Sequence, residues 1–176
     1  MAAPAPDPAP DPARPRRNRT ARRGPSGLRR PPADDADPLT GLASRRRLER
    51  ALTRLLATRR GEHAEAAPRG ACVLVDVVGL KGVNHDRGYS AGDRLLVEAA
   101  ARLRCVAPTA RIVARLGGDE FVALFTGPRA ASEAAEACRQ AAAGLPRLRA
   151  GWEAIHPGSG PASLFDRLHA ACRGAR

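Results

Sequence analysis

The sequence predicts a layered α/β (α+β) domain, with a central sheet that contains an antiparallel hairpin and is flanked by helices. Two observations support this fold class. Short apolar runs rich in β-branched residues alternate with longer segments in which apolar residues recur at helical spacing. In addition, Gly117 and Gly118 separate the apolar runs 111–116 and 121–125, and glycine tolerates the backbone angles of a tight hairpin turn.

The first 36 residues are predicted to form a disordered, basic tail rich in proline and arginine, which leaves 37–176 as the folded domain. They hold nine of the 16 prolines and a single leucine, so they cannot bury enough apolar surface to offset the entropy lost on ordering. The net charge of +12 makes weak contact of this tail with nucleic acid or another polyanion a secondary expectation. Too few aromatic residues are present to provide a platform for base stacking.

The distribution of apolar residues also indicates where in the cell the protein is expected. No apolar run approaches the roughly 20 residues of a membrane-spanning helix, and residues 1–15 lack the apolar core of a signal peptide. We therefore expect a cytoplasmic protein with no membrane contact. The four cysteines, Cys72, Cys105, Cys138 and Cys172, lie far apart and mostly within apolar segments, which predicts buried reduced thiols rather than a zinc site.

The first half of the domain is predicted as helix, strand and helix. Asp37-Pro38 is a helix-start signal, and the apolar residues at 48, 51, 52, 55 and 56 then follow the spacing of an amphipathic helix. The run 71–78 is short and β-branched enough to be a strand covered on both faces. A second helix is expected over about 91–104, with Ser90 and Asp93 at the spacing of a capping box.

The second half is predicted to begin with the hairpin and to end on a helix. The strands 111–116 and 121–125 form the hairpin, and an alanine-rich helix follows over about 130–143. A weaker strand at 148–154 and a closing helix at 161–172 complete the order.

Two or three carboxylates are predicted to meet on adjacent strands of the sheet. Asp76 interrupts the apolar run of the buried strand, and Asp119 and Glu120 lie on a hairpin tip that would pair beside that strand. Carboxylate oxygens suit Mg²⁺, and a buried carboxylate must be hydrogen-bonded, neutralised or bound to metal. Each feature also has a structural explanation, since Asp76 could cap a loop and 117–120 could be an ordinary turn. Together they favour an enzyme that acts on phosphates.

Over 37–176 the sequence resembles the GGDEF domains, which are diguanylate cyclases and their degenerate relatives. Four motifs in the family's order carry the resemblance. They are Asp37-Pro38-Leu39-Thr40-Gly41-Leu42, then Asp76-Val77-Val78-Gly79-Leu80-Lys81-Gly82-Val83-Asn84, then Gly88, Gly92 and Asp93, and finally Arg115-Leu116 leading into Gly117-Gly118-Asp119-Glu120-Phe121.

The resemblance implies a palm-type nucleotidyl cyclase fold and a diguanylate cyclase reaction. Two domains of a homodimer, each holding one GTP, would face each other and form cyclic di-GMP with release of pyrophosphate. The implied cofactor is Mg²⁺ (or Mn²⁺). Its implied ligands are Asp76, the backbone carbonyl of Val77, Asp119 and Glu120.

The resemblance also implies roles toward the nucleotide. Glu120 would activate the attacking hydroxyl, and Lys81 would bind phosphate; with Asp119 they form the implied catalytic set. The implied substrate-binding residues are Asn84 and Asp93 on the guanine edge, Gly117 and Gly118 beside the phosphates, and Arg176 on phosphate. Three of these have structural alternatives, because Asp93 could cap a helix, Asn84 could be a turn residue and Lys81 could be a solvated surface residue.

Some positions depart from the family pattern. Val78, His85 and Tyr89 differ from the usual residues, although none is a primary metal ligand. His169 stands where the family usually has aspartate, and Arg176 where it has lysine. A later arginine and a final strand are absent, so we expect weaker triphosphate binding and a short sheet edge.

These departures lead to three further expectations. Positions 108–111 read Pro-Thr-Ala-Arg instead of the Arg-x-x-Asp of the family's inhibitory product site, which predicts no product inhibition there. No recognisable sensory or coiled-coil segment precedes Asp37, so dimerisation would come from the domain, the tail or a partner. The second hypothesis for function is a degenerate, non-catalytic GGDEF domain that binds GTP or a protein partner.

Overall fold

A five-stranded mixed sheet forms the centre of this computed structural model, which describes residues 31–57 and 68–174. The strands are β1 (Ala43–Ser44), β2 (Gly70–Val77), β3 (Ile112–Gly117), β4 (Glu120–Thr126) and β5 (Leu148–Ile155). They lie in the order β1-β3-β4-β2-β5. β1 is parallel to β3, and the other neighbouring strands are antiparallel. The predicted α+β fold with a central hairpin is therefore confirmed.

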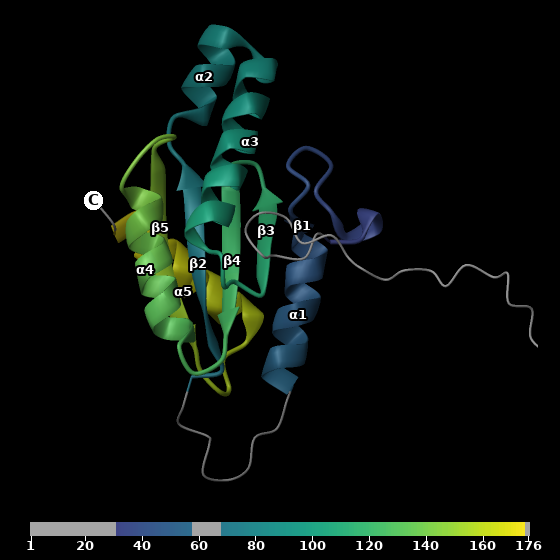
Figure 1. Cartoon of the computed structure of the whole chain (residues 1–176), viewed down its shortest axis with the longest axis vertical. Helices are drawn as coiled ribbons and strands as arrows, with labels where there is room; N and C mark the ends of the chain where they lie inside the picture. The colour runs from purple at the N-terminus through teal and green to yellow at the C-terminus, as the bar shows by residue number, and fades with distance from the viewer. Residues whose placement is uncertain (1–30, 58–67, 175–176) are drawn as a thin grey trace, which may run out of the picture.

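Helices cover both faces of the sheet (Figure 1). They are α1 (Arg45–Ala57), α2 (Leu80–Arg87), α3 (Tyr89–Val106), α4 (Ala130–Ala142) and α5 (Pro161–Gly174). Buried residues of α3 and α4 share one hydrophobic cluster with the sheet, while those of α1 and α5 share the other. α2 and the adjoining part of α3 extend beyond the end of the sheet (Figure 1).

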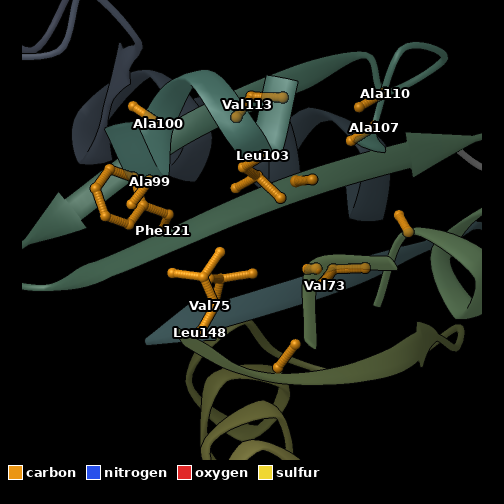
Figure 2. Close-up of a cluster of buried hydrophobic side chains, with 14 of the residues drawn as sticks. Val73, Val75, Ala99, Ala100, Leu103, Ala107, Ala110, Val113, Phe121 and Leu148 are labelled. Atoms are coloured by element: carbon orange, nitrogen blue, oxygen red, sulfur yellow. The ribbon is translucent and has the colours of Figure 1, made fainter. Parts of the chain in front are cut away.

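The alternation of side chains along the strands produces these two clusters. In β2, Val73 and Val75 face α3 and α4, whereas Cys72 and Leu74 face α1 and α5. Figure 2 shows the first cluster, in which Val75 lies near Phe121 and Leu148 of the neighbouring strands. β2 is buried on both faces, as predicted, and Asp76 is its one residue that is not fully buried.

The two predicted helix-start signals at 37–38 and 90–93 are wrong. α1 begins at Arg45, and the Asp37 carboxylate instead accepts hydrogen bonds from the backbone N–H and the hydroxyl of Thr40, at 2.8 and 2.7 Å. These bonds form a local turn, which is a common alternative role for aspartate. α3 begins at Tyr89 after Gly88 and has no side-chain cap, so the predicted capping box does not form.

The sequence patterns did not predict α2 or the short strand β1. α2 lacks an amphipathic pattern and contains Gly82 and Asn84, which are poor helix formers. None of its residues is fully buried, and it packs alongside α3, so tertiary contact rather than propensity stabilises it. β1 has only two residues, which pair with β3, and Ala43 also forms an isolated bridge with Ala36; a strand this short is too short to show a periodic pattern.

The last part of the predicted tail contacts the domain. Residues 33–35 form a turn of 3₁₀ helix, and the Asp35 carboxylate pairs with Arg47 at 3.3 Å and also with Arg50 of α1. The rest of the predicted tail, 1–30, lies outside the described residues. Within the described part of the chain, no helix is long and apolar enough to cross a membrane.

The cysteine prediction holds in part. All four thiols are free, and Cys72 and Cys172 are buried, but Cys138 is half-buried and Cys105 is exposed on α3. The apolar composition of this segment does not reveal which face of the helix carries Cys105, and the structure places it on the exposed face. Burial raises the pKa of the Cys72 thiol to about 12, which makes this group unreactive at neutral pH.

Candidate functional site

The hairpin between β3 and β4 has a two-residue tip, Gly118 and Asp119. Gly117 and Gly118 have φ angles of 141° and 55°, which strain any residue with a side chain. The Arg115 guanidinium donates two hydrogen bonds to the Gly118 carbonyl, from Nε at 3.1 Å and Nη2 at 2.7 Å. The tip is therefore a braced turn whose shape depends on glycine.

Arg115 also links the tip to the segment that precedes α1. Its Nη1 lies 3.4 Å from the Asp37 carboxylate. Burial alone would raise the pKa of Asp37, but the hydrogen bonds from Thr40 and the charge of Arg115 outweigh it and hold this pKa below the usual range. Asp37 is thus a charged anchor for the side chain that holds the tip.

The tip is fixed to the end of β2, which brings the three predicted carboxylates together. The Val77 N–H donates to the Asp119 carbonyl at 3.1 Å, and Asp76 lies directly opposite Glu120 in the β2–β4 register. Val122 and Leu124 belong to the cluster that faces α1 and α5, so Glu120 points to that same side, together with Asp76. The sequence reasoning that placed Asp119 close to Asp76 agrees with this arrangement.

The negative charges at this point repel one another. The pKa of Asp76 is raised, first by its partial burial and then by the charges of Asp119 and Glu120, while Arg149 acts in the opposite direction. Because burial and the neighbouring carboxylates make ionisation of Asp76 unfavourable, a bound cation would stabilise its charged form. Within residues 31–57 and 68–174, however, no three His, Cys, Asp or Glu side chains are grouped closely enough to hold a metal by themselves.

Replacing Asp76 with asparagine is expected to increase the free energy of unfolding of the metal-free protein at pH 7. Because the folded state raises the pKa of this group, the ionised form destabilises the native protein, and asparagine removes that penalty. The advantage of the variant should shrink as the pH falls through the folded pKa, since wild-type Asp76 then becomes protonated. Urea denaturation with EDTA measures both trends, with exposed Asp166→Asn as the control. A less stable Asp76→Asn protein at pH 7 would contradict the charge assignment.

Two residues that sequence reasoning did not place in the site also contact these carboxylates. His169 Nε2 of α5 lies 3.0 Å from Glu120 Oε1, and Arg149 Nη1 of β5 lies 3.4 Å from Asp76 Oδ2. His169 was noted as a departure from the family pattern, but its contact was not foreseen. Arg149 gave one signal in the sequence, a charged residue between the buried positions Leu148 and Ala150 of the predicted strand.

The other predicted residues lie on the helix pair beyond the sheet. Lys81 is exposed in the first turn of α2, which follows Gly79 at φ 85° and begins without a side-chain cap. Asn84 lies in α2, and Gly92 and Asp93 lie in the adjoining α3. A Cβ at Gly92 would lie 1.9 Å from Asn84 Oδ1, so the glycine makes room for the amide. Arg176 lies outside the described residues.

The whole arrangement is a cluster of carboxylates at the end of β2, followed by the uncapped start of α2 and by the Asn84 amide, which lies against Gly92 of α3. The profile of the family described as "Diguanylate cyclase, GGDEF domain" matches residues 34–153. The chain belongs to the GGDEF domain family. Its predicted membership of this family is confirmed.

The chain is also similar to individual proteins over part of its length. An uncharacterized protein encoded in the hutH 5′ region of Streptomyces griseus is 41% identical over 116 residues, which are 60% of this chain and 44% of that protein. Diguanylate cyclase DgcN of Escherichia coli K12 is 32% identical over 102 residues, 58% of this chain and 24% of that protein. The GGDEF chain described here thus spans less than half the length of these two relatives.

The fold has counterparts among solved structures. The crystal structure of the diguanylate cyclase SiaD from Pseudomonas aeruginosa superposes with a TM-score of 0.64 and 27% identity, over 81% of this chain and 58% of that one. The GGDEF domain of TpbB (YfiN) from the same species gives a TM-score of 0.64 and 28% identity, over 80% of this chain and 87% of that one.

Proposed function

We propose that this GGDEF domain is a diguanylate cyclase, which condenses two GTP molecules into cyclic di-GMP and two pyrophosphates across a dimer of domains. In each half-reaction a bond forms between a 3′-oxygen and an α-phosphorus, and the bond from that phosphorus to pyrophosphate breaks. The proton of the 3′-hydroxyl passes to the Glu120 carboxylate and then to solvent. The meeting of Asp76, Asp119 and Glu120 beside the start of α2 is the observation that carries this proposal.

The residues present fit a divalent cation. Asp76 has a raised pKa because of its burial and its carboxylate neighbours, a penalty that a cation would relieve. Mg²⁺ commonly takes one or two protein carboxylates and completes its shell with phosphate oxygens and water, so a preformed cage of three side chains is not required. Asp76, Asp119, Glu120 and the Val77 carbonyl would hold Mg²⁺ or Mn²⁺. The ion would supply positive charge that stabilises the phosphoryl transfer.

The chain's own groups would bind and orient the nucleotide. The backbone N–H groups in the first turn of α2, which has no side-chain cap, and the Lys81 ammonium would attract the negatively charged phosphates of the nucleotide. The exposed glycines of the tip leave open space where a backbone can approach a phosphate, since a Cβ at Gly117 or Gly118 would meet nothing within 4 Å. Asn84 and Asp93 offer an amide and a carboxylate, which match the donor and acceptor edge of guanine.

The proposed activity is tested by incubating the full chain with GTP and Mg²⁺ and separating the nucleotides. GTP binding is measured in parallel. Wild-type protein is expected to form cyclic di-GMP, and Glu120→Gln is expected to form less than one hundredth as much. The glutamine keeps an oxygen that can accept the His169 hydrogen bond. Equal product from this variant would overturn the assigned site, and GTP binding without product would overturn the cyclase activity.

A second candidate function is a non-catalytic domain that binds GTP. Arg149 and His169 support it, because each already contacts one of the carboxylates that would hold metal. In this case the protein binds GTP in the same experiment and releases no cyclic di-GMP.

Guanine recognition provides a separate prediction. In Gly92→Ala, the new Cβ would clash with Asn84 Oδ1 at 1.9 Å, so the amide must turn away. We expect GTP to bind about tenfold more weakly and its preference over ATP to fall, because a lost polar contact to a base leaves its partner unpaired. Gly82→Ala is a matched control, since a Cβ there meets nothing within 4 Å. Isothermal titration with both nucleotides measures the change, and unaltered GTP preference in Gly92→Ala would refute the role of Asn84.

A further inference from the structure

Arg149 occupies a position from which it can reach both the carboxylates and a bound nucleotide. It lies directly opposite Asp76 in the β2–β5 register. Its strand neighbours Leu148 and Ala150 belong to the cluster facing α3 and α4, so Arg149 points to the other side, where Glu120 lies. The row across this end of the sheet is therefore Glu120, Asp76 and Arg149.

The backbone of Arg149 is held firmly while its side chain is exposed. The Cys172 thiol of α5 lies 3.5 Å from the Arg149 carbonyl. At Gly151, a Cβ would lie 2.3 Å from the Cys172 nitrogen, so α5 passes against β5 at a distance that only glycine permits. The Arg149 side chain, in contrast, is 42% exposed. A rigid base with a solvent-accessible guanidinium is suited to binding a ligand from solution.

The existing partner of Arg149 is a weak one. A single nitrogen lies 3.4 Å from Asp76, and both side chains are partly exposed, which describes an ion pair that contributes little. Guanidinium carries five N–H donors in a planar fork, so most of them remain available. Phosphate oxygens accept two of them in parallel and carry more negative charge than one carboxylate. A nucleotide phosphate therefore competes effectively with Asp76 for this guanidinium.

Two further cations lie around the same end of the sheet. The Arg147 carbonyl accepts a hydrogen bond from the Val78 N–H at 3.0 Å, which places the start of β5 beside the turn that leads into α2. Lys81 follows in the first turn of that helix. Among the described residues, neither the Arg147 nor the Lys81 side chain has an ion-pair partner. The carboxylates thus have basic groups on the side of β5 and α2.

We propose that Arg149 is a phosphate-binding residue of the nucleotide site, which leaves Asp76 when GTP binds and pairs with phosphate oxygens. This inference rests on the proposed function to the extent that it requires the domain to bind GTP. The exchange has a second consequence, because it frees Asp76 for a divalent cation as the nucleotide arrives. Arg149 would then contribute a phosphate contact from β5, in addition to any made from the end of α5.

The test is isothermal titration of the full chain with GTP and with guanosine, in the presence of Mg²⁺. In Arg149→Ala, GTP is expected to bind about ten- to hundredfold more weakly, the effect of losing a hydrogen bond to a charged group, while guanosine affinity stays within twofold of wild type. Arg149→Lys should recover only part of the GTP affinity, because an ammonium lacks the planar fork. Arg139→Ala is the control, since Arg139 is likewise exposed and paired with a carboxylate, Glu136 of α4.

The outcomes separate this inference from the proposed activity. GTP binding by Arg149→Ala that equals or exceeds that of wild type would overturn the inference and leave Arg149 as an internal counter-ion of Asp76. Wild-type protein that binds GTP but forms no cyclic di-GMP would overturn the cyclase activity alone. Wild-type protein that binds no GTP would overturn both. Thermal unfolding of each variant without nucleotide shows whether a loss of affinity comes from misfolding. If Arg149→Ala is misfolded, the GTP affinity of Arg149→Lys is compared with that of wild type instead.

Discussion

Replacing Asp119 with asparagine is expected to lower the rate of cyclic di-GMP formation by about 10²–10³-fold, the usual cost of removing one preorganised electrostatic group from an active site. The main chain of this residue, rather than its side chain, fixes the hairpin tip, because Val77 donates to the Asp119 carbonyl at 3.1 Å. The substitution should therefore leave the fold unchanged and remove only the charge of the carboxylate.

Initial rates at saturating GTP and Mg²⁺ measure this effect, together with thermal unfolding. Exposed Asp166→Asn on α5 is a control of the same chemistry at a position outside the site. A rate for Asp119→Asn within twofold of the control would show that the carboxylate is not part of the catalytic machinery. A large fall in unfolding temperature would instead show that the side chain stabilises the tip.

Replacing Phe121 with alanine is expected to reduce the free energy of unfolding by about 3–5 kcal/mol, as is typical for a fully buried phenylalanine. Phe121 is 0% exposed and lies among residues of β2, β3 and α3 in the first hydrophobic cluster (Figure 2). Its position next to Glu120 makes it part of the family motif, yet its side chain faces the opposite side of the sheet. We therefore assign it to the core rather than to the chemistry.

Urea denaturation of the two proteins measures this loss. Phe165→Ala of α5 is a matched control, because Phe165 is only half-buried at the edge of the second cluster and should cost less. A Phe121→Ala protein with nearly wild-type stability and lost activity would show that the ring acts in the site. Because small domains are stable by only about 5–15 kcal/mol, the expected loss is a large fraction of the total stability.

The longer strands and helices were predictable because most of them have a clear local pattern. The run 70–77 is apolar except for Asp76, and 91–104 has a helical stripe of apolar residues, so the burial pattern favours a strand and a helix there. α2 was not predictable in this way, since no residue of it is fully buried and its stability comes from α3. The same holds for Asp37, whose partners Thr40 and Arg115 include one residue 78 positions away.

The site was predictable to the extent that it lies on neighbouring strands. Asp76 and Asp119 could be placed together because a hairpin pairs beside the buried strand, and β4 does pair with β2. The contacts of Arg149 and His169 depend on the register of β5 and the seating of α5 against Gly151. Neither quantity follows from local spacing, so these two residues required the three-dimensional structure.

The contact between Asp37 and Arg115 gives the domain a mechanical linkage. One guanidinium holds Asp37, at the point where the chain enters the domain, and the Gly118 carbonyl, at the tip that carries Asp119. Arg115 is thus a direct side-chain connection between the segment at Asp37 and the hairpin tip. We therefore expect a movement of the chain at Asp37 to shift the position of the hairpin tip through Arg115.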